Sequence, residues 1–303
     1  MTEKKEKCTQ CPRMCKADRS IHPGRCGATN DIEVSHYMLH RWEEPPISGY
    51  DEKRGSGAVF FTHCPLGCVY CQNQKISRPL SEGQVYTEGE LSDLFVKLQC
   101  DGAYNINLVS PTQYTDKLIT SVKLAKEKGL SIPVVWNTGG YERPETIESL
   151  KDTVDIFLTD FKYSSPQLAE ELSLAPDYPE YAKKSLAAMY GVTGKPVFTK
   201  DETGHDYLTK GVIVRHLLLP SHRDDSVSVL RNIADTVAPD SILLSLMAQF
   251  TPEFLPDDGS HKRIRRKITT YEYSIVLREA VKLGFRGFSQ ERSSATRRFT
   301  PDF

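Results

Sequence analysis

Short apolar runs alternate with helix-like segments over most of the chain, and this alternation limits the folds that it can adopt. Each run is rich in Val, Ile, Leu and Phe, which is typical of buried strands. Strands that alternate with helices in this way predict a largely parallel sheet. We therefore expect an α/β fold, an incomplete (β/α)6-type TIM barrel with an N-terminal Cys-rich extension. The six expected strands are residues 58–62, 105–109, 132–136, 154–158, 212–219 and 242–247, and residues 196–208 predict a hairpin before the fifth.

Two capping boxes mark helix starts between the expected strands. Thr87-x-x-Glu90 and Thr269-x-x-Glu272 each precede apolar residues at helical spacing. Cys100 falls at the end of the first of these helices, where we expect a buried small hydrophobe rather than a reactive thiol. The other helical patterns cover residues 118–125 and 227–237.

A length of 303 residues suits one barrel-sized domain with an appendage. We expect a Cys-rich metal-binding segment at 1–57, the barrel at 58–290, and a C-terminal tail at 291–303 that wraps the barrel mouth or frays. The formal net charge of -1 gives no reason to expect a nucleic-acid or membrane partner. The start lacks the apolar run of a signal peptide, and no later stretch is apolar enough to span a bilayer. These observations predict a cytoplasmic protein.

Cys64, Cys68 and Cys71 follow directly on the first expected strand. In a reducing compartment, clustered cysteines are more often metal ligands or catalytic thiols than disulfides. Thiolates so closely spaced on one loop can converge on a single soft metal centre. A structural zinc site is the alternative, but it requires a fourth ligand, for which the adjacent His63 is the nearest candidate.

This Cys-x3-Cys-x2-Cys loop resembles that of the radical S-adenosylmethionine (SAM) superfamily, in which the motif follows the first barrel strand and an aromatic residue precedes the last Cys, as Tyr70 does here. The resemblance implies that Cys64, Cys68 and Cys71 hold a [4Fe-4S] cluster by three irons and that SAM chelates the fourth. It also implies reductive cleavage of SAM to a 5'-deoxyadenosyl radical, which abstracts a substrate hydrogen. Tyr70 is expected to support adenine, and Asn73 to contact the cofactor.

Polar residues recur at the ends of the other expected strands, where barrel enzymes gather their functional groups. Asp160 and Lys162 are two residues apart on an extended segment, so both should point into the barrel, as active-site groups or as a purely structural ion pair. Arg215 and His216 are adjacent, and we expect Arg215 to point inward and His216 outward, unless a bulge reverses them. Asp160, Lys162 and Arg215 are the candidate catalytic residues. The candidate cofactor contacts also include Ser110, Thr112, Asn137, Thr138 and Gln249.

Within the superfamily, residues 58–249 most resemble pyruvate formate-lyase activating enzymes. Asn137-Thr-Gly-Gly140 is similar to their ribose-contacting segment, and Asp160-Phe-Lys162 to their Asp-x-Lys signature. Their Gly-Gly-Glu is absent, since Ser110-Pro-Thr112 stands in its place. The resemblance implies hydrogen abstraction from a glycine or other backbone site of a partner protein. The alternatives are a peptide or small-metabolite substrate, or a non-catalytic zinc-binding protein.

A second cysteine group, Cys8, Cys11, Cys15 and Cys26, offers four thiolates, enough for an auxiliary iron–sulfur cluster or for a zinc ion. The basic run 261–267 is typical of a solvated face. It is also a candidate dock for an acidic electron donor such as flavodoxin or ferredoxin. Without interleaved aromatic residues, the run does not indicate nucleic-acid binding.

Overall fold

A computed structural model describes residues 7–49, 53–202 and 204–289 of the chain. Within these residues seven strands run parallel in one sheet. Six of them overlap the runs expected from the sequence, with ends shifted by up to a few residues, so the prediction of a mixed α/β fold around a mostly parallel sheet is confirmed. The seven are β2 (Gly55–Phe61), β4 (Ala103–Val109), β5 (Val134–Thr138), β6 (Ile156–Asp160), β8 (Asp206–Leu217), β9 (Leu243–Met247) and β10 (Arg286–Ser289).

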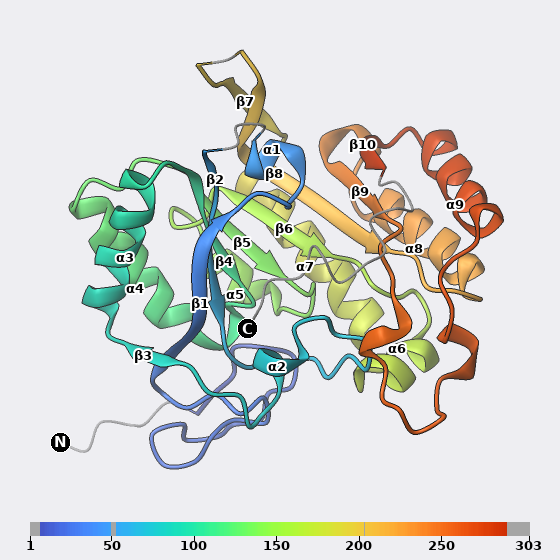
Figure 1. Ribbon diagram of the computed structural model, residues 1–303, viewed down its shortest axis with the longest axis horizontal. Coiled ribbons are helices and arrows are strands. Elements are labelled where there is room, and N and C mark those ends of the chain that lie inside the picture. The colour runs from blue at the N-terminus through green and yellow to red at the C-terminus, as the bar shows by residue number, and fades with distance from the viewer. Residues whose placement is uncertain (1–6, 50–52, 203, 290–303) are drawn as a thin grey trace.

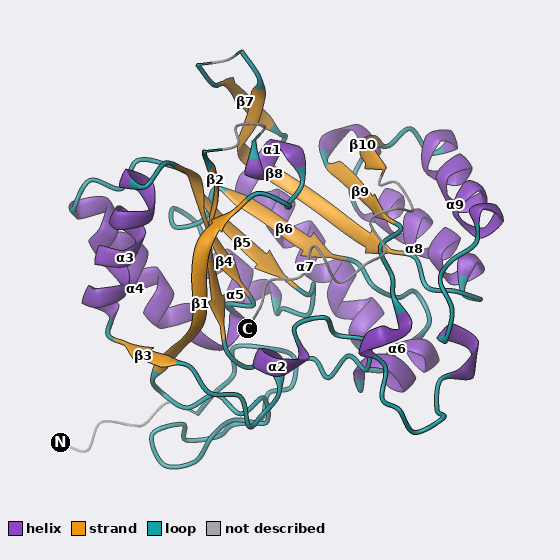
Figure 2. Cartoon of the chain, in the orientation of Figure 1, coloured by secondary structure: helices purple, strands orange, loops and turns teal. Residues whose placement is uncertain are grey.

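The strand β10 was not expected, and it pairs with β9 at one end of the sheet. Its sequence, Arg286-Gly-Phe-Ser289, is too short and too polar to show an apolar pattern. The strand order is β10-β9-β8-β6-β5-β4-β2 and continues into two more strands described below. In this order the described strands form an open curved sheet rather than a closed ring (Figure 2).

The N-terminal extension contributes to the same sheet. Strand β1 (Ile32–His40) runs antiparallel to β2, and β3 (Gln84–Tyr86) runs antiparallel to β1 at the far edge. The expected boundary at residue 57 therefore falls inside the sheet, because it lies within β2, which hydrogen-bonds to β1 of the N-terminal extension. The expected hairpin is present, with β7 (Val197–Lys200) antiparallel to the start of β8. The expected tail, 291–303, lies outside the described residues.

The longer helices lie along the outer face of the curved sheet (Figure 1). Both capping boxes form, at Thr87 with Glu90 and at Thr269 with Glu272. The expectation that Cys100 is buried is wrong, because it lies at the exposed end of its helix, beyond the apolar stripe that ends at Leu98. The helices are α1 (Pro45–Ser48), α2 (Gln74–Ser77), α3 (Glu88–Cys100), α4 (Thr115–Glu127), α5 (Pro144–Ser149), α6 (Pro166–Ser173), α7 (Tyr178–Thr193), α8 (Arg223–Thr236) and α9 (Thr270–Lys282), with 3-10 turns at Thr112–Tyr114, Pro239–Ser241, Pro252–Phe254 and Lys262–Ile264.

The short helix α1 places an apolar side chain among the inward-facing residues at the start of the strands. Ile47 is fully buried there. It shares a cluster with Val135, Ile156, Leu158, Leu208, Ile213 and Leu243. Asn105 of β4 donates a hydrogen bond to the Ile47 carbonyl oxygen at 2.7 Å, which fixes α1 against the sheet. The segment before β2 thus fills one end of the sheet's concave side.

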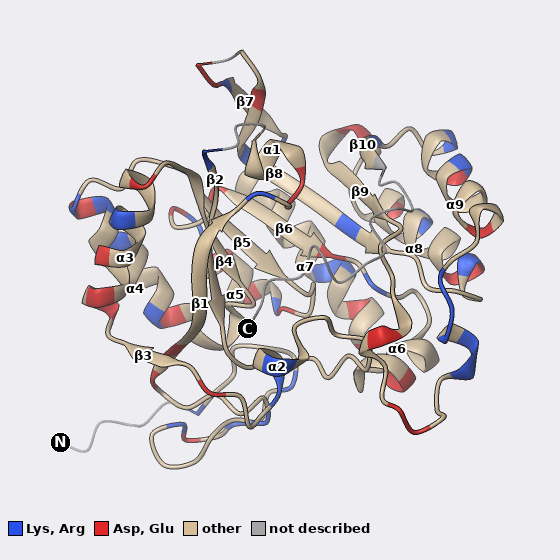
Figure 3. Ribbon diagram, viewed as in Figure 1, with Lys and Arg blue, Asp and Glu red and all other residues tan. Residues whose placement is uncertain are grey.

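Charged residues lie mainly on the helices and loops (Figure 3). Strand β8 is an exception, because it carries Arg215 well inside the strand. None of the described helices is both long enough and apolar enough to cross a membrane.

Replacing Ile47 by Ala should lower the free energy of unfolding by about 2–5 kcal/mol, because it leaves a cavity in a fully buried cluster. Equilibrium urea unfolding followed by circular dichroism would measure the change. Val281→Ala, at a side chain that is 69% exposed, is the matched control and should change the unfolding midpoint little. An Ile47→Ala protein as stable as this control would contradict the packing described for α1.

Candidate functional site

A cavity of about 210 Å³ opens at the carboxyl ends of the parallel strands and extends inward between them. Twelve residues that the sequence singles out line it together. They come from the loop after β2 and from the ends of β4, β5, β6, β8 and β9. They are Cys64, Cys68, Tyr70, Cys71, Asn73, Ser110, Asn137, Thr138, Asp160, Lys162, Arg215 and Gln249.

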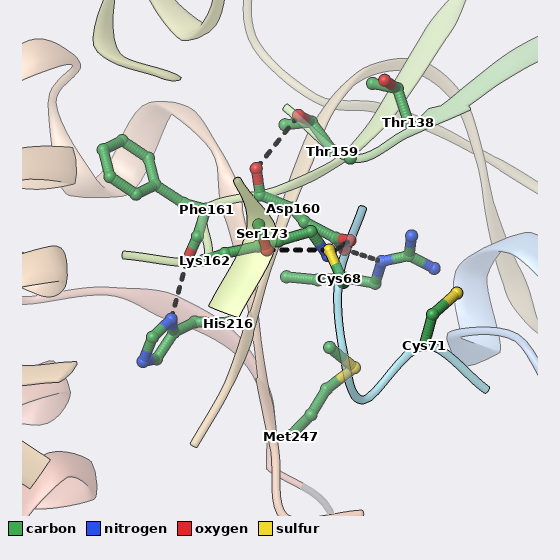
Figure 4. Close-up of polar contacts among 12 residues, drawn as sticks. Cys68, Cys71, Thr138, Thr159, Asp160, Phe161, Lys162, Ser173, His216 and Met247 are labelled. Atoms are coloured by element: carbon green, nitrogen blue, oxygen red, sulfur yellow. Dashed lines mark hydrogen bonds and ion pairs between the residues drawn. The ribbon is translucent and has the colours of Figure 1, made fainter. Parts of the chain in front are cut away.

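The loop that carries Cys64, Cys68 and Cys71 is held by several hydrogen bonds. The Ser173 hydroxyl at the end of α6 lies 2.9 Å from the Cys68 sulfur (Figure 4). Arg78 donates to the Cys68 carbonyl oxygen at 2.9 Å. The Val69 amide donates to the Leu172 carbonyl oxygen at 2.9 Å. The loop is therefore positioned against α6.

The thiols of this loop are poorly solvated. Burial raises the pKa of both Cys64 and Cys68, although Lys162 partly offsets the effect at Cys68. Both groups are therefore neutral thiols at neutral pH in the absence of a metal. Binding of a soft metal centre would displace their protons.

Tyr70 lines the cavity with its ring while its hydroxyl group faces away into a buried chain of hydroxyls. It lies 2.6 Å from the Tyr163 hydroxyl, which in turn lies 2.7 Å from the Ser173 hydroxyl. The ring meets Phe250 edge to face at a centroid distance of 5.9 Å. These contacts fix one orientation of the Tyr70 ring at the cavity wall.

Asp160 lies between two cations at the carboxyl ends of the parallel strands. Its carboxylate oxygens are 2.6 Å from Lys162 Nζ and 2.8 Å from Arg215 Nε, and Figure 4 shows Asp160 and Lys162 beside Cys68. Arg215 also donates to Asn137 Oδ1 at 2.7 Å. Burial raises the pKa of Asp160, but Arg215 and Lys162 more than offset it, so the carboxyl pKa is lowered. Asp160, Lys162 and Arg215 thus form one ionised network across β6 and β8.

The adjacent pair on β8 points in opposite directions, as the alternation of a regular strand predicts. Arg215 faces the cavity, whereas the His216 ring is buried outside it, with Nδ1 2.7 Å from the Phe161 carbonyl oxygen. Burial lowers the pKa of His216 to about 4, so the ring is neutral. The strand has no bulge at this point to reverse the two.

Thr112 departs from the expected set, because it does not line the cavity. Its hydroxyl donates to Glu142 at 2.8 Å, and Thr138 donates to the same carboxyl oxygen. Burial raises the pKa of Glu142 to about 7. The 3-10 turn after Pro111 directs Thr112 sideways to this carboxyl, so its position does not match that of a cofactor contact.

Glu43 lines the cavity although nothing in its sequence context indicated a role. Its carboxylate oxygens are 3.5 Å from Arg215 Nη1 and 3.4 Å from Asn137 Nδ2. Burial raises its pKa, and Arg215 only partly opposes this. Glu43 precedes the parallel strands, so it does not belong to the strand ends, where barrel enzymes gather their functional groups.

The second cysteine group lies beside the first. Cys8, Cys11, Cys15 and Cys26 line a small pocket together with Pro65 of the Cys64 loop. The segment that carries these cysteines contains tight turns, in which Met14 and Lys16 adopt a left-handed backbone conformation. Arg13 donates to the Pro65 carbonyl oxygen at 3.0 Å. Within the described ranges, no three His, Cys, Asp or Glu side chains are already grouped as ligands for a metal ion.

The chain is similar in sequence to one known protein and similar in fold to two solved structures, described below. No family model matches the chain. An uncharacterized protein of Methanocaldococcus jannaschii is 28% identical over 286 residues, which cover 91% of this chain and 74% of that protein. A radical SAM methyltransferase from Sphaerobacter thermophilus matches 78% of the chain in structure, with a TM-score of 0.50 and 15% identity. Methylornithine synthase matches 74%, with a TM-score of 0.48 and 15% identity.

The chain spans slightly under two thirds of those two solved structures, 66% and 61% of their lengths. At this identity the likeness to the methyltransferase concerns the fold. The fold, a mixed α/β arrangement around a mostly parallel sheet, is similar to that of the radical SAM methyltransferase. In this chain a polar cavity opens at the carboxyl ends of the parallel strands.

Asp160→Asn should reduce the free energy of unfolding by about 3–5 kcal/mol, because it removes the carboxylate that pairs with both Lys162 and Arg215 and leaves Lys162 buried without its ion-pair partner. Urea unfolding would measure it, with Glu180→Gln at the exposed Lys184 pair as control. The control should shift the midpoint far less. Equal midpoints for the two variants would show that the buried network does not hold the strands together.

Proposed function

We propose that this protein is a radical SAM enzyme that binds a [4Fe-4S] cluster through Cys64, Cys68 and Cys71 and SAM in the adjoining cavity. The observation that carries the proposal is that all three cysteines line one cavity with the polar strand ends. A fold shared with a radical SAM methyltransferase supports it. When bound, the cluster and SAM supply an electron and a 5'-deoxyadenosyl radical that abstracts a substrate hydrogen.

The donor set fits such a cluster. Three soft thiols on one loop provide three ligands, and the loop faces a cavity with room for a further ligand. His63, the nearest candidate for the fourth ligand that zinc would need, does not line the cavity, and its Nε2 lies 3.5 Å from the Glu33 carboxylate. This arrangement favours the cluster over structural zinc.

The chain's own residues would hold and orient the cofactors. Ser173 and Lys162 lie beside Cys68, where a hydroxyl donor and a cation stabilise a thiolate. Asn137 and Arg215 present amide and guanidinium groups to the cavity, held in place by Asp160. The Tyr70 ring offers a flat apolar surface for adenine. Walls so largely buried would keep water from a reactive intermediate.

For the substrate, we propose hydrogen abstraction from a glycine or other backbone site of a partner protein, as the resemblance to pyruvate formate-lyase activating enzymes implies. A peptide or a small metabolite is the alternative.

Flavodoxin or ferredoxin is the proposed electron donor. The basic run is only partly available to dock it, because Arg266 pairs with Glu272 at 2.7 Å and Arg265 Nε donates to the Ser260 carbonyl oxygen.

Cys68→Ala should abolish formation of 5'-deoxyadenosine by anaerobically reconstituted protein given dithionite and SAM, because the cluster loses one of its three ligands. Liquid chromatography of the products would measure it. Cys100→Ala, at an exposed cysteine on α3, is the control and should retain the wild-type rate. A colourless wild-type protein that contains zinc and forms no 5'-deoxyadenosine would end the enzyme hypothesis.

We also propose that Cys8, Cys11, Cys15 and Cys26 bind a second metal centre, an auxiliary iron–sulfur cluster or a zinc ion. Their shared pocket supports the proposal, and Arg13 links it to the Cys64 loop. An auxiliary cluster would relay electrons, whereas a zinc ion would stabilise the fold of the N-terminal segment.

Cys15→Ala should remove this second metal while leaving the first cluster, because only one of the two cysteine groups is altered. Elemental analysis for iron and zinc, with sulfide determination, would identify what is lost relative to Cys100→Ala. Wild type and Cys15→Ala with the same metal content would contradict the second site.

A further inference from the structure

The inner end of the cavity is built by the segment that precedes the parallel strands. β1 runs antiparallel to β2, so that His40 pairs with Ser56 at the start of β2, whereas the Cys64 loop follows the end of β2 at Phe61. Five residues of strand separate these two levels, or about 16 Å. His40 and Glu43 line the cavity from this inner side, below the cysteines.

Apolar packing closes the cavity below this level. Ile47 and its cluster fill the space at the start of the strands. Along β6 the inward-facing residue changes from apolar Leu158 to polar Asp160, two residues later. Along β8 it changes in the same way from Ile213 to Arg215. The inner end is therefore a polar layer on an apolar base.

The donors of this layer are already engaged. Arg215 uses Nε on Asp160 and Nη2 on Asn137, at 2.8 Å and 2.7 Å, and its remaining Nη1 faces Glu43. Lys162 donates to Asp160. An anionic group at the inner end would compete with Asp160 and Glu43 for these two cations.

The acceptors, in contrast, exceed the donors. Three carboxyl groups lie near the two cations: Glu43 and Asp160 line the cavity, and Glu44, outside the lining, interacts with Arg215. The hydrogen bonds to Glu43 are long, at 3.4–3.5 Å. Asn107 Oδ1 and Glu44 Oε2 are buried and have no hydrogen-bond partner among the residues that the structure describes.

His40 adds a further acceptor. It is only 7% exposed and lines the cavity, and its Nδ1 has no partner within the described part of the chain. Burial lowers the pKa of His40, although Glu44 opposes this, so the ring is neutral and one nitrogen accepts. Buried acceptors without partners are costly, and a ligand with several N–H groups could donate to His40 and Glu43, which line the cavity.

The side walls of the same cavity are apolar. Phe60, Val109, Leu217 and Met247 line it between the inner end and the mouth. A short alkyl chain would contact these walls, while a charged group at its end would reach the acceptors. An aliphatic chain with a terminal N–H donor fits both features.

We propose that the inner end of the cavity binds a primary ammonium group of the substrate and that Glu43 is its counter-ion. The substrate class is thus an aliphatic amine, free or carried by a larger molecule. This inference rests on the proposed function, because it assigns the substrate side of the same cavity. Glu43 lies in the segment before β2, so a residue outside the parallel strands would select the substrate.

The test uses n-butylammonium, n-butanol and butyrate as probes of the full-length, cluster-reconstituted protein without SAM. Binding is followed anaerobically by ligand-observed nuclear magnetic resonance. Butylammonium should bind at least about tenfold more tightly than butanol, because a charge-assisted hydrogen bond contributes that much, and butyrate should bind most weakly. Equal binding of the three probes, or preference for butyrate, would overturn the proposal.

Glu43→Gln should remove the preference for butylammonium, and Glu145→Gln, at a carboxylate exposed by 67%, should keep it. If Glu43→Gln kept the preference for butylammonium, Glu43 would not be the counter-ion of the ammonium group. Should Glu43→Gln fail to fold by circular dichroism, the wild-type ranking of the three probes still decides the outcome, and Glu43→Asp should weaken butylammonium binding.

Two results separate this proposal from the proposed function. Wild-type protein that cleaves SAM but shows no ammonium preference would overturn the ammonium site alone. Displacement of butylammonium by added SAM would assign the inner end to SAM itself and would also overturn it. Ammonium binding without any cleavage of SAM would support the site while rejecting the radical SAM activity.

Discussion

The arrangement of the cavity depends on the burial of Asp160 between Lys162 and Arg215. Two cations at the carboxyl ends of the parallel strands would be strongly destabilising without a counter-charge, and Asp160 accepts from both at 2.6 Å and 2.8 Å. The same carboxylate joins β6 to β8 and, through Arg215, to Asn137 of β5. One buried charge therefore sets the positions of polar groups from three strands. Those groups form the wall opposite the cysteine loop.

The segment before the parallel strands completes what this network begins. It supplies β1 at the edge of the sheet, the apolar base around Ile47 and the carboxylate of Glu43 beside Arg215. Its earlier part carries four cysteines to the side of the Cys64 loop, where Arg13 bonds to Pro65. The N-terminal residues thus reach both ends of the cavity, and changes in them would alter the site while leaving the parallel strands intact.

Features with a short-range physical signal were predictable from the sequence. The alternation of a strand placed Arg215 inward and His216 outward, and the capping boxes at Thr87 and Thr269 placed two helix starts. Features that depend on long-range packing were not. Glu43 lies some 170 positions before Arg215, its charge partner, and β10 is a strand only because β9 is beside it. Thr112 faces Glu142 because of a local turn, and Cys100 is exposed because the helix stripe stops at Leu98.

The central claim is that three cysteines hold a cluster with one iron open to a SAM-binding cavity. Electron paramagnetic resonance of the anaerobically reconstituted, dithionite-reduced protein tests it most directly, because the spectrum reports on the ligands of the cluster. If the three cysteines hold such a cluster, the spectrum should show the signal of a reduced [4Fe-4S] cluster, and the shape of this signal should change when SAM is added. A protein without a cluster signal, or with a signal that SAM leaves unchanged, would contradict it.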